Sequence, residues 1–149
     1  MFFRSSPCSG KSRYVREHAG DQDVIYDYDA LLYALTNRTE HLTAKHAAHP
    51  LIVDLRRVLV DLAMADVKRQ ITTFWMICSW PNSYTLSAIR GLKHEKIYIQ
   101  ASREECLDRL MKDQTRPDKD AWTAVINDWF QQYGHYPERW AESEVRIIR

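Results

Sequence analysis

Short apolar runs alternate along this chain with stretches whose apolar residues recur at helical spacing. The strand-like runs are 1–4, 23–26, 71–78, 96–100 and 144–148, and the helical stretches are 11–18, 30–35, 50–70, 84–90, 103–113 and 121–133. Strands that alternate with helices are typical of α/β domains with a mostly parallel sheet and helices on both of its faces. Ligands in such folds bind at the carboxyl ends of the strands. We therefore expect a three-layer α/β fold with its site at that edge of the sheet.

The composition agrees with a single domain over residues 1–149. The chain is 45% hydrophobic and 28% charged, which excludes a disordered or low-complexity chain. Its net charge of +1 argues against a stable nucleic-acid complex or an anionic membrane as partner. No apolar run approaches the ~20 residues of a membrane span. The three widely spaced cysteines favour a reducing, cytoplasmic compartment over a disulfide framework or a zinc site.

An eight-residue segment, S-S-P-C-S-G-K-S at 5–12, lies where the first strand gives way to the first helix. Its last three residues match the phosphate-loop pattern G-x-x-x-x-G-K-[ST]. In that pattern Gly10 lets backbone amides turn toward phosphate oxygens, Lys11 reaches the phosphates and Ser12 places its hydroxyl on Mg²⁺. The expected phosphate-binding residues are Pro7, Cys8, Ser9, Gly10, Lys11, Ser12 and Arg13, together with Arg109.

One position departs from the phosphate-loop pattern. Ser5 stands where the pattern has its first glycine, which normally helps the chain to leave the strand tightly. A chance G-K-S in a loop is the competing interpretation. The position of the segment, at the first strand-to-helix turn of an alternating pattern, favours phosphate binding.

Two acidic residues, Asp27 and Asp29, follow the second strand. Residues at i and i+2 of an extended segment share a side, so both carboxylates could meet one substrate. The alternative is that Asp29 caps the helix that begins at Ala30, while Asp27 is a solvated turn residue. The third strand ends without the acid that often supports Mg²⁺, so Asp27 and Asp29 become the main candidates for that role. The sequence does not decide between the two carboxylates.

Basic residues gather in the stretch R-L-M-K-D-Q-T-R-P-D-K-D at 109–120. On a helix that continued to residue 116, Arg109, Lys112 and Arg116 would share the face opposite the apolar residues. A positioned guanidinium stabilises the charge that spreads over a transferring phosphoryl group. An ordinary solvated helix face is the alternative. We expect a short lid over about 109–120, with Arg109 and Arg116 as its main candidates.

Other polar and aromatic residues give weaker signals. His41, His46 and His49 lie in a polar stretch that is expected to be a loop, without the acidic or cysteine neighbours of a metal site. Trp80 follows the third strand and could stack on a base. The apolar stripe at 122–133 is expected to be core.

The string P-C-S-G-K-S-x-x-V-R-E-H-A-G at 7–20, followed by a strand that ends D-x-D-A-L, resembles the small P-loop kinases often encoded by actinobacterial phages. More broadly, residues 5–35 resemble nucleoside monophosphate kinases and 5′-polynucleotide kinases. The resemblance implies a nucleoside-monophosphate-kinase-like P-loop NTPase fold and transfer of a phosphoryl group from ATP, with Mg²⁺, to a deoxynucleoside monophosphate. It implies that Lys11 stabilises the transferring charge and that Ser12 ligates Mg²⁺. Asp27 or Asp29 would position the acceptor, and Arg109 or Arg116 would close over the phosphates.

Two other functions are compatible with the same residues. A 5′-hydroxyl polynucleotide kinase would use a carboxylate after the second strand as a base, because a sugar hydroxyl must lose its proton. A nucleotide-binding module without catalysis would explain Ser5 and the missing acid after the third strand. The intact Gly10-Lys11-Ser12 argues against the non-catalytic module.

Overall fold

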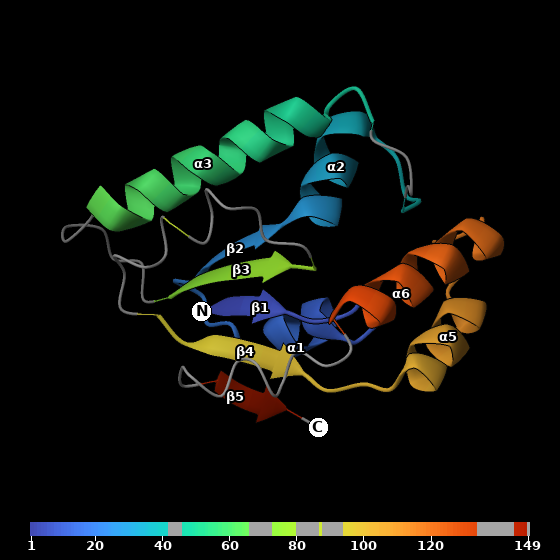
Figure 1. The fold of residues 1–149 in the computed structure, drawn as a ribbon. Coiled ribbons are helices and arrows are strands. Elements are labelled where there is room, and N and C mark those ends of the chain that lie inside the picture. Colours follow the sequence, from blue (N-terminus) through green and yellow to red (C-terminus); the bar gives the residue numbers. More distant parts are fainter. Residues whose placement is uncertain (42–45, 66–72, 80–86, 88–93, 134–144, 149) are drawn as a thin grey trace.

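The computed structural model describes residues 1–41, 46–65, 73–79, 87, 94–133 and 145–148 (Figure 1). Five strands form one sheet in the order β2-β3-β1-β4-β5, and every neighbouring pair is parallel. The strands are β1 (Phe2–Arg4), β2 (Val24–Asp27), β3 (Phe74–Cys78), β4 (Lys96–Ile99) and β5 (Val145–Ile148). The expected parallel α/β sheet is confirmed, and β1 lies at its centre.

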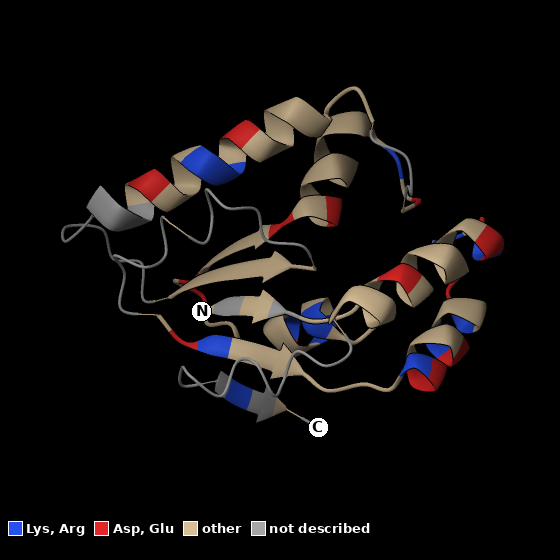
Figure 2. Ribbon diagram, in the orientation of Figure 1, with Lys and Arg blue, Asp and Glu red and all other residues tan. Residues whose placement is uncertain are grey.

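The helices between these strands begin and end close to the expected positions. They are α1 (Lys11–His18), α2 (Tyr28–Thr36), α3 (His49–Ala65), α5 (Arg103–Lys112) and α6 (Lys119–Tyr133). None of the helices in the described ranges is long and apolar enough to cross a membrane. Lysines and arginines are interspersed with acidic residues along α3 and α5, in keeping with the balanced composition (Figure 2).

Alternate residues of β3 join different hydrophobic clusters, because successive side chains of a strand point to opposite faces. Met76 and Cys78 pack with Tyr26 of β2 and with buried residues of α2 and α3. Trp75 and Ile77 pack with residues of β1, β4 and α1. The sheet is therefore covered on both faces, as a three-layer fold requires.

A third cluster joins α5 to α6 beyond the carboxyl ends of the strands (Figure 1). Trp122, Ile126 and Trp129 are the buried residues of α6, so the expectation that this stripe is core is confirmed. The buried members of the cluster are Ala101, Cys106, Leu110, Trp122 and Ile126. The helical hairpin thereby stands next to the loop that follows β1, whose Cys8 packs against this cluster.

One helix cap differs from the sequence prediction, and a second cap follows the same rule. Asp27, not Asp29, caps α2: its side chain accepts a hydrogen bond from the backbone amide of Asp29 at 3.1 Å. Likewise, Asp118 rather than Asp120 accepts from the first turn of α6, through the amide of Ala121 at 2.9 Å. In both cases the acid just before the helix lies where it can reach orphan amides, and the later acid is already helical.

Several expectations fall outside the described residues. These are the helix at 84–90 apart from Ser87, the end of the long helix beyond residue 65, the start of the third strand at 71–72, and the side chain of Trp80.

Candidate functional site

Residues 5–12 leave the central strand β1, pass over its carboxyl end and enter α1. Gly10 has a φ of 104°, a conformation that side-chain-bearing residues rarely adopt, and it stands at the N-cap of α1. Cys8 also has a positive φ, of 60°. The loop is closed on itself by a bond from the Ser9 amide to the Ser6 carbonyl, 3.2 Å long. The segment thus has the curled shape in which backbone amides can surround an anion.

Lys11 turns back into this loop. Its Nζ donates to the carbonyl oxygens of Ser5 at 2.9 Å and of Ser6 at 2.6 Å, and the residue is only 8% exposed. Burial lowers the pKa of Lys11 to about 8. A cation held away from water next to a helix N-terminus is a strong site for phosphate oxygens.

Ser12 and Asp27 are joined across the end of the sheet. The Ser12 hydroxyl donates to Asp27 Oδ2 at 2.7 Å, which brings the carboxylate after β2 to the start of α1. The Asp29 Oδ2 lies 2.9 Å from His41 Nδ1. The i, i+2 geometry of a strand does not apply to the pair, because the chain is already helical at Tyr28, but the charges of both carboxylates act on Lys11. Asp27 belongs with the phosphate loop.

Arg109 of α5 lies against the loop at 5–12. Its Nη1 donates to the carbonyl oxygen of Ser9 at 2.8 Å and to that of Cys8 at 3.3 Å. These bonds span about a hundred residues of sequence, from α5 to the loop after β1. Arg109 is therefore one of the predicted site residues that the structure brings to this loop.

Arg116 is not on the face of α5, because that helix ends at Lys112. The extended backbone of Asp113 (φ −84°, ψ 107°) turns the chain into a loop. Within the loop, Arg116 forms an ion pair with the Asp113 carboxylate, and its guanidinium carbon lies 4.9 Å from the centre of the Trp122 ring. The expectation of one basic helix face is therefore wrong for Arg116, although it stays in the lid region.

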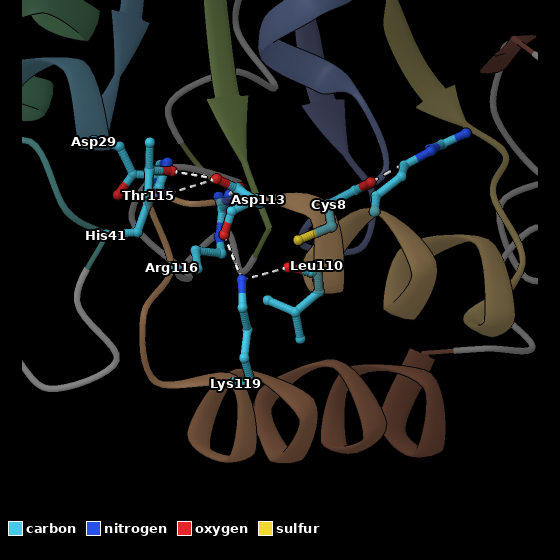
Figure 3. A network of polar contacts seen from close by, with 9 residues as sticks. Cys8, Asp29, His41, Leu110, Asp113, Thr115, Arg116 and Lys119 are labelled. Carbon is cyan, nitrogen blue, oxygen red and sulfur yellow. Dashed lines mark hydrogen bonds and ion pairs between the residues drawn. The ribbon is translucent and has the colours of Figure 1, made fainter.

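A network of polar contacts stabilises the loop between α5 and α6, at 113–118 (Figure 3). Lys119 donates to the carbonyls of Leu110, at 2.7 Å, and of Asp113. Burial alone would raise the pKa of Asp113, but hydrogen bonds from Thr115 and the charge of Arg116 outweigh it and hold the pKa below its usual value. The loop is also tied to the segment after α2, since the His41 amide donates to the Thr115 carbonyl at 2.8 Å.

Ser5 has a role that the sequence did not reveal. Its side chain is fully buried, and its Oγ accepts a hydrogen bond from the Ile99 amide at 2.7 Å. Ser5 is not among the described residues with positive φ, so the conformational freedom of a glycine is not needed here. The serine instead joins the start of the loop to the end of β4.

The remaining predicted site residues are less directly placed. Pro7 and Ser9 are buried in the loop, and Cys8 is half-buried. Burial raises the pKa of the Cys8 thiol, so it stays protonated near neutral pH. Arg13 points away: it is exposed and pairs with Glu17 at 2.8 Å, so the structure does not bring it to the loop. Within the described ranges, no three His, Cys, Asp or Glu side chains gather as a metal cluster.

Comparison with known protein families and with curated proteins gives no match for this chain.

The Ser5–Ile99 bond predicts a stability difference between two serines of the same loop. Ser5→Ala leaves the buried Ile99 amide without a partner, which costs ~1–3 kcal/mol. Ser9→Ala is the matched control, because the Ser9 Oγ is buried and has no hydrogen-bond partner. Urea unfolding of the ligand-free protein should show a lower midpoint for Ser5→Ala and an unchanged or higher one for Ser9→Ala. Equal midpoints would contradict this role of Ser5.

Proposed function

We propose that this protein is a P-loop kinase that transfers the γ-phosphoryl group of ATP, with Mg²⁺, to a small nucleotide, in the first place a deoxynucleoside monophosphate. The observation that carries the proposal is the meeting of Lys11 and Arg109 at one loop, after the central strand. Two cations beside backbone amides at a helix N-terminus suit a polyphosphate better than any neutral ligand.

Lys11 would bind and stabilise the donor phosphates. In the free protein its ammonium group donates to the Ser5 and Ser6 carbonyls. Phosphate oxygens entering the loop offer a stronger, charged acceptor at the same place. As charge spreads over the equatorial oxygens of the transferring group, Lys11 on one side and Arg109 on the other would stabilise it.

The oxygens of Ser12 and Asp27 fit Mg²⁺. A hydroxyl and a carboxylate oxygen, 2.7 Å apart, form the kind of small oxygen set with which proteins hold this ion, the rest being water and substrate phosphates. Mg²⁺ bound there would neutralise charge on the β- and γ-phosphates. The Ser12 hydroxyl would give up its bond to Asp27 to become a ligand.

Asp29 would contact the acceptor nucleotide, because Asp27 is assigned to Mg²⁺. A monophosphate acceptor is already ionised near pH 7 and needs no base, so Asp29 would hold a sugar hydroxyl. The contact between Asp29 and His41 favours one second candidate, a 5′-hydroxyl kinase. There the carboxylate would take the proton of the attacking hydroxyl, and an imidazole would hold the carboxylate in position.

The first test is a product assay with ATP-Mg²⁺ against deoxynucleoside monophosphates, nucleosides and 5′-hydroxyl oligonucleotides. We expect diphosphates from the monophosphates, and a loss of ~100-fold or more in kcat/KM for Lys11→Met. Arg16→Met, an exposed cation on the same helix, is the control and should keep its activity. Absence of product from every acceptor, with ATP still bound, would leave the non-catalytic module as the better description.

The second test asks whether Asp27 and Asp29 have the separate roles proposed above. Asp27→Asn should lower kcat by ~10–100-fold and raise the Mg²⁺ concentration needed, because it removes an oxygen from the metal side. Asp29→Asn should mainly raise the KM for the monophosphate. Strong labelling of 5′-hydroxyl oligonucleotides that Asp29→Asn abolishes would instead establish the second candidate.

The low pKa of Lys11 predicts that ATP binding takes up a proton. Phosphate oxygens would raise this pKa again, so above pH 8 the complex holds a proton that the free protein lacks. ATP affinity should then fall as the pH rises from 8 to about 9.5, by up to tenfold per pH unit. Titration calorimetry in buffers of different ionisation enthalpy measures the uptake directly. Lys11→Met should show neither effect, and an equal pH slope in that variant would contradict the assignment.

A further inference from the structure

Four buried polar atoms near residues 113–119 have no hydrogen-bond partner: Tyr33 Oη, His41 Nδ1, Arg116 Nε and Trp122 Nε1. His41 Nδ1 lies at ion-pair distance, 2.9 Å, from Asp29 Oδ2, which leaves three atoms for a further partner. Buried polar atoms in folded proteins are nearly always paired, with protein, with ordered water or with a bound ion. Sequence reasoning did not single out Tyr33, and it assigned Trp122 to the core. A gathering of unpaired atoms in one region therefore calls for a ligand that would pair them.

The three side chains come from different elements and meet around His41. The His41 ring lies edge-on to Tyr33 of α2, with ring centres 5.4 Å apart, and edge-on to Trp122 of α6, at 6.2 Å. Arg116, from the lid loop, stacks over Trp122. The charges of Asp29 and Arg116 both act on the Tyr33 phenol, which places it beside them. We call Tyr33, Arg116 and Trp122 the donor strip.

The chemistry of the donor strip selects an anion. Indole Nε1 and guanidinium Nε can only donate hydrogen bonds, and a tyrosine hydroxyl donates as long as it is protonated. Burial raises the pKa of Tyr33 to about 12, so the hydroxyl keeps its proton near neutral pH. Arg116 uses Nη1 on Asp113 and leaves Nε for another acceptor. Three donors call for oxygens rich in lone pairs, such as those of a phosphate monoester.

The position of the donor strip matches the acceptor side of the proposed reaction. His41 connects the strip to Asp29 through the 2.9 Å contact, and its amide connects it to the lid at Thr115. The loop at 5–12 is also close to the strip: Arg109 of the same lid segment donates to the Ser9 carbonyl, and the charge of Arg116 acts on the Cys8 thiol. We propose that Tyr33, Arg116 and Trp122 form the subsite that binds the phosphate of the acceptor nucleotide. This assignment rests on the proposed kinase function for its role, but the binding itself can be tested without catalysis.

The sharpest variant is Tyr33→Phe, because binding and stability should respond in opposite ways. Removing an unpaired buried hydroxyl leaves the thermal midpoint of the free protein unchanged or raises it. The same change removes a hydrogen bond to a charged group, so deoxynucleoside monophosphates should bind ~10-fold more weakly. The control is Tyr14→Phe, where the tyrosine stacks on His18 of α1 and should leave binding unaltered. Trp122→Phe keeps a buried aromatic ring, removes Nε1 and should also weaken binding.

The measurement is titration calorimetry without ATP, with the four deoxynucleoside monophosphates, the matching nucleosides and inorganic phosphate as separate probes. We expect the nucleosides to bind at least tenfold more weakly than their monophosphates, and Tyr33→Phe to erase most of that difference. Nucleosides that bind as tightly as monophosphates, or no monophosphate binding at all, would overturn the subsite. So would a Tyr33→Phe protein that is less stable but binds normally. If monophosphate binding depends on Tyr33 but no acceptor is phosphorylated by ATP, the phosphate subsite is supported and the proposed kinase activity is refuted.

Discussion

A buried ammonium group shapes the whole site. Lys11 exchanges water for the carbonyls of Ser5 and Ser6, an arrangement that lowers its pKa and requires the loop to curl around it. The curl in turn requires a left-handed residue at Gly10, and its entry is fastened to β4 by Ser5. Because β1 lies between β3 and β4, this loop stands at the middle of the sheet edge, within reach of Asp27 from β2 and of Arg109 from α5.

The segment 109–120 is held at two points in the absence of ligand. Arg109 bonds to the carbonyls of the loop after β1, and the Thr115 carbonyl accepts from the His41 amide after α2. The Asp113–Arg116 pair and Lys119 fix the shape of the segment (Figure 3). Cations that are already in position lose little freedom when a polyphosphate binds, which favours tight binding and electrostatic stabilisation. Entry of a ligand would require Arg109 to exchange loop carbonyls for phosphate oxygens.

Local sequence rules predicted most of the elements but not the long-range partners. Periodicity located the strands and helices, and the G-K-S segment marked the turn after the central strand. The i, i+2 rule failed for Asp27 and Asp29 because α2 begins one residue after β2 ends. Helical spacing failed for Arg116 because α5 ends before it. The bond between Ser5 and Ile99 joins residues 94 apart in sequence, and no local pattern carries such information.

The donor strip illustrates what a sequence pattern hides. Tyr33 and Trp122 both lie in stretches with helical spacing of apolar residues; Trp122 is buried and Tyr33 is half-buried, so their rings satisfy the pattern. Only the surroundings reveal that the hydroxyl of one and the indole NH of the other have no acceptor. Such unpaired atoms lower the free energy of unfolding of the free protein. A ligand that accepts hydrogen bonds from them raises this free energy when it binds. If phosphates occupy both the loop and the strip, Arg109 and Arg116 belong to one short segment that both ligands contact. By linkage, any factor by which the donor changes the affinity for the acceptor must equal the factor by which the acceptor changes the affinity for the donor.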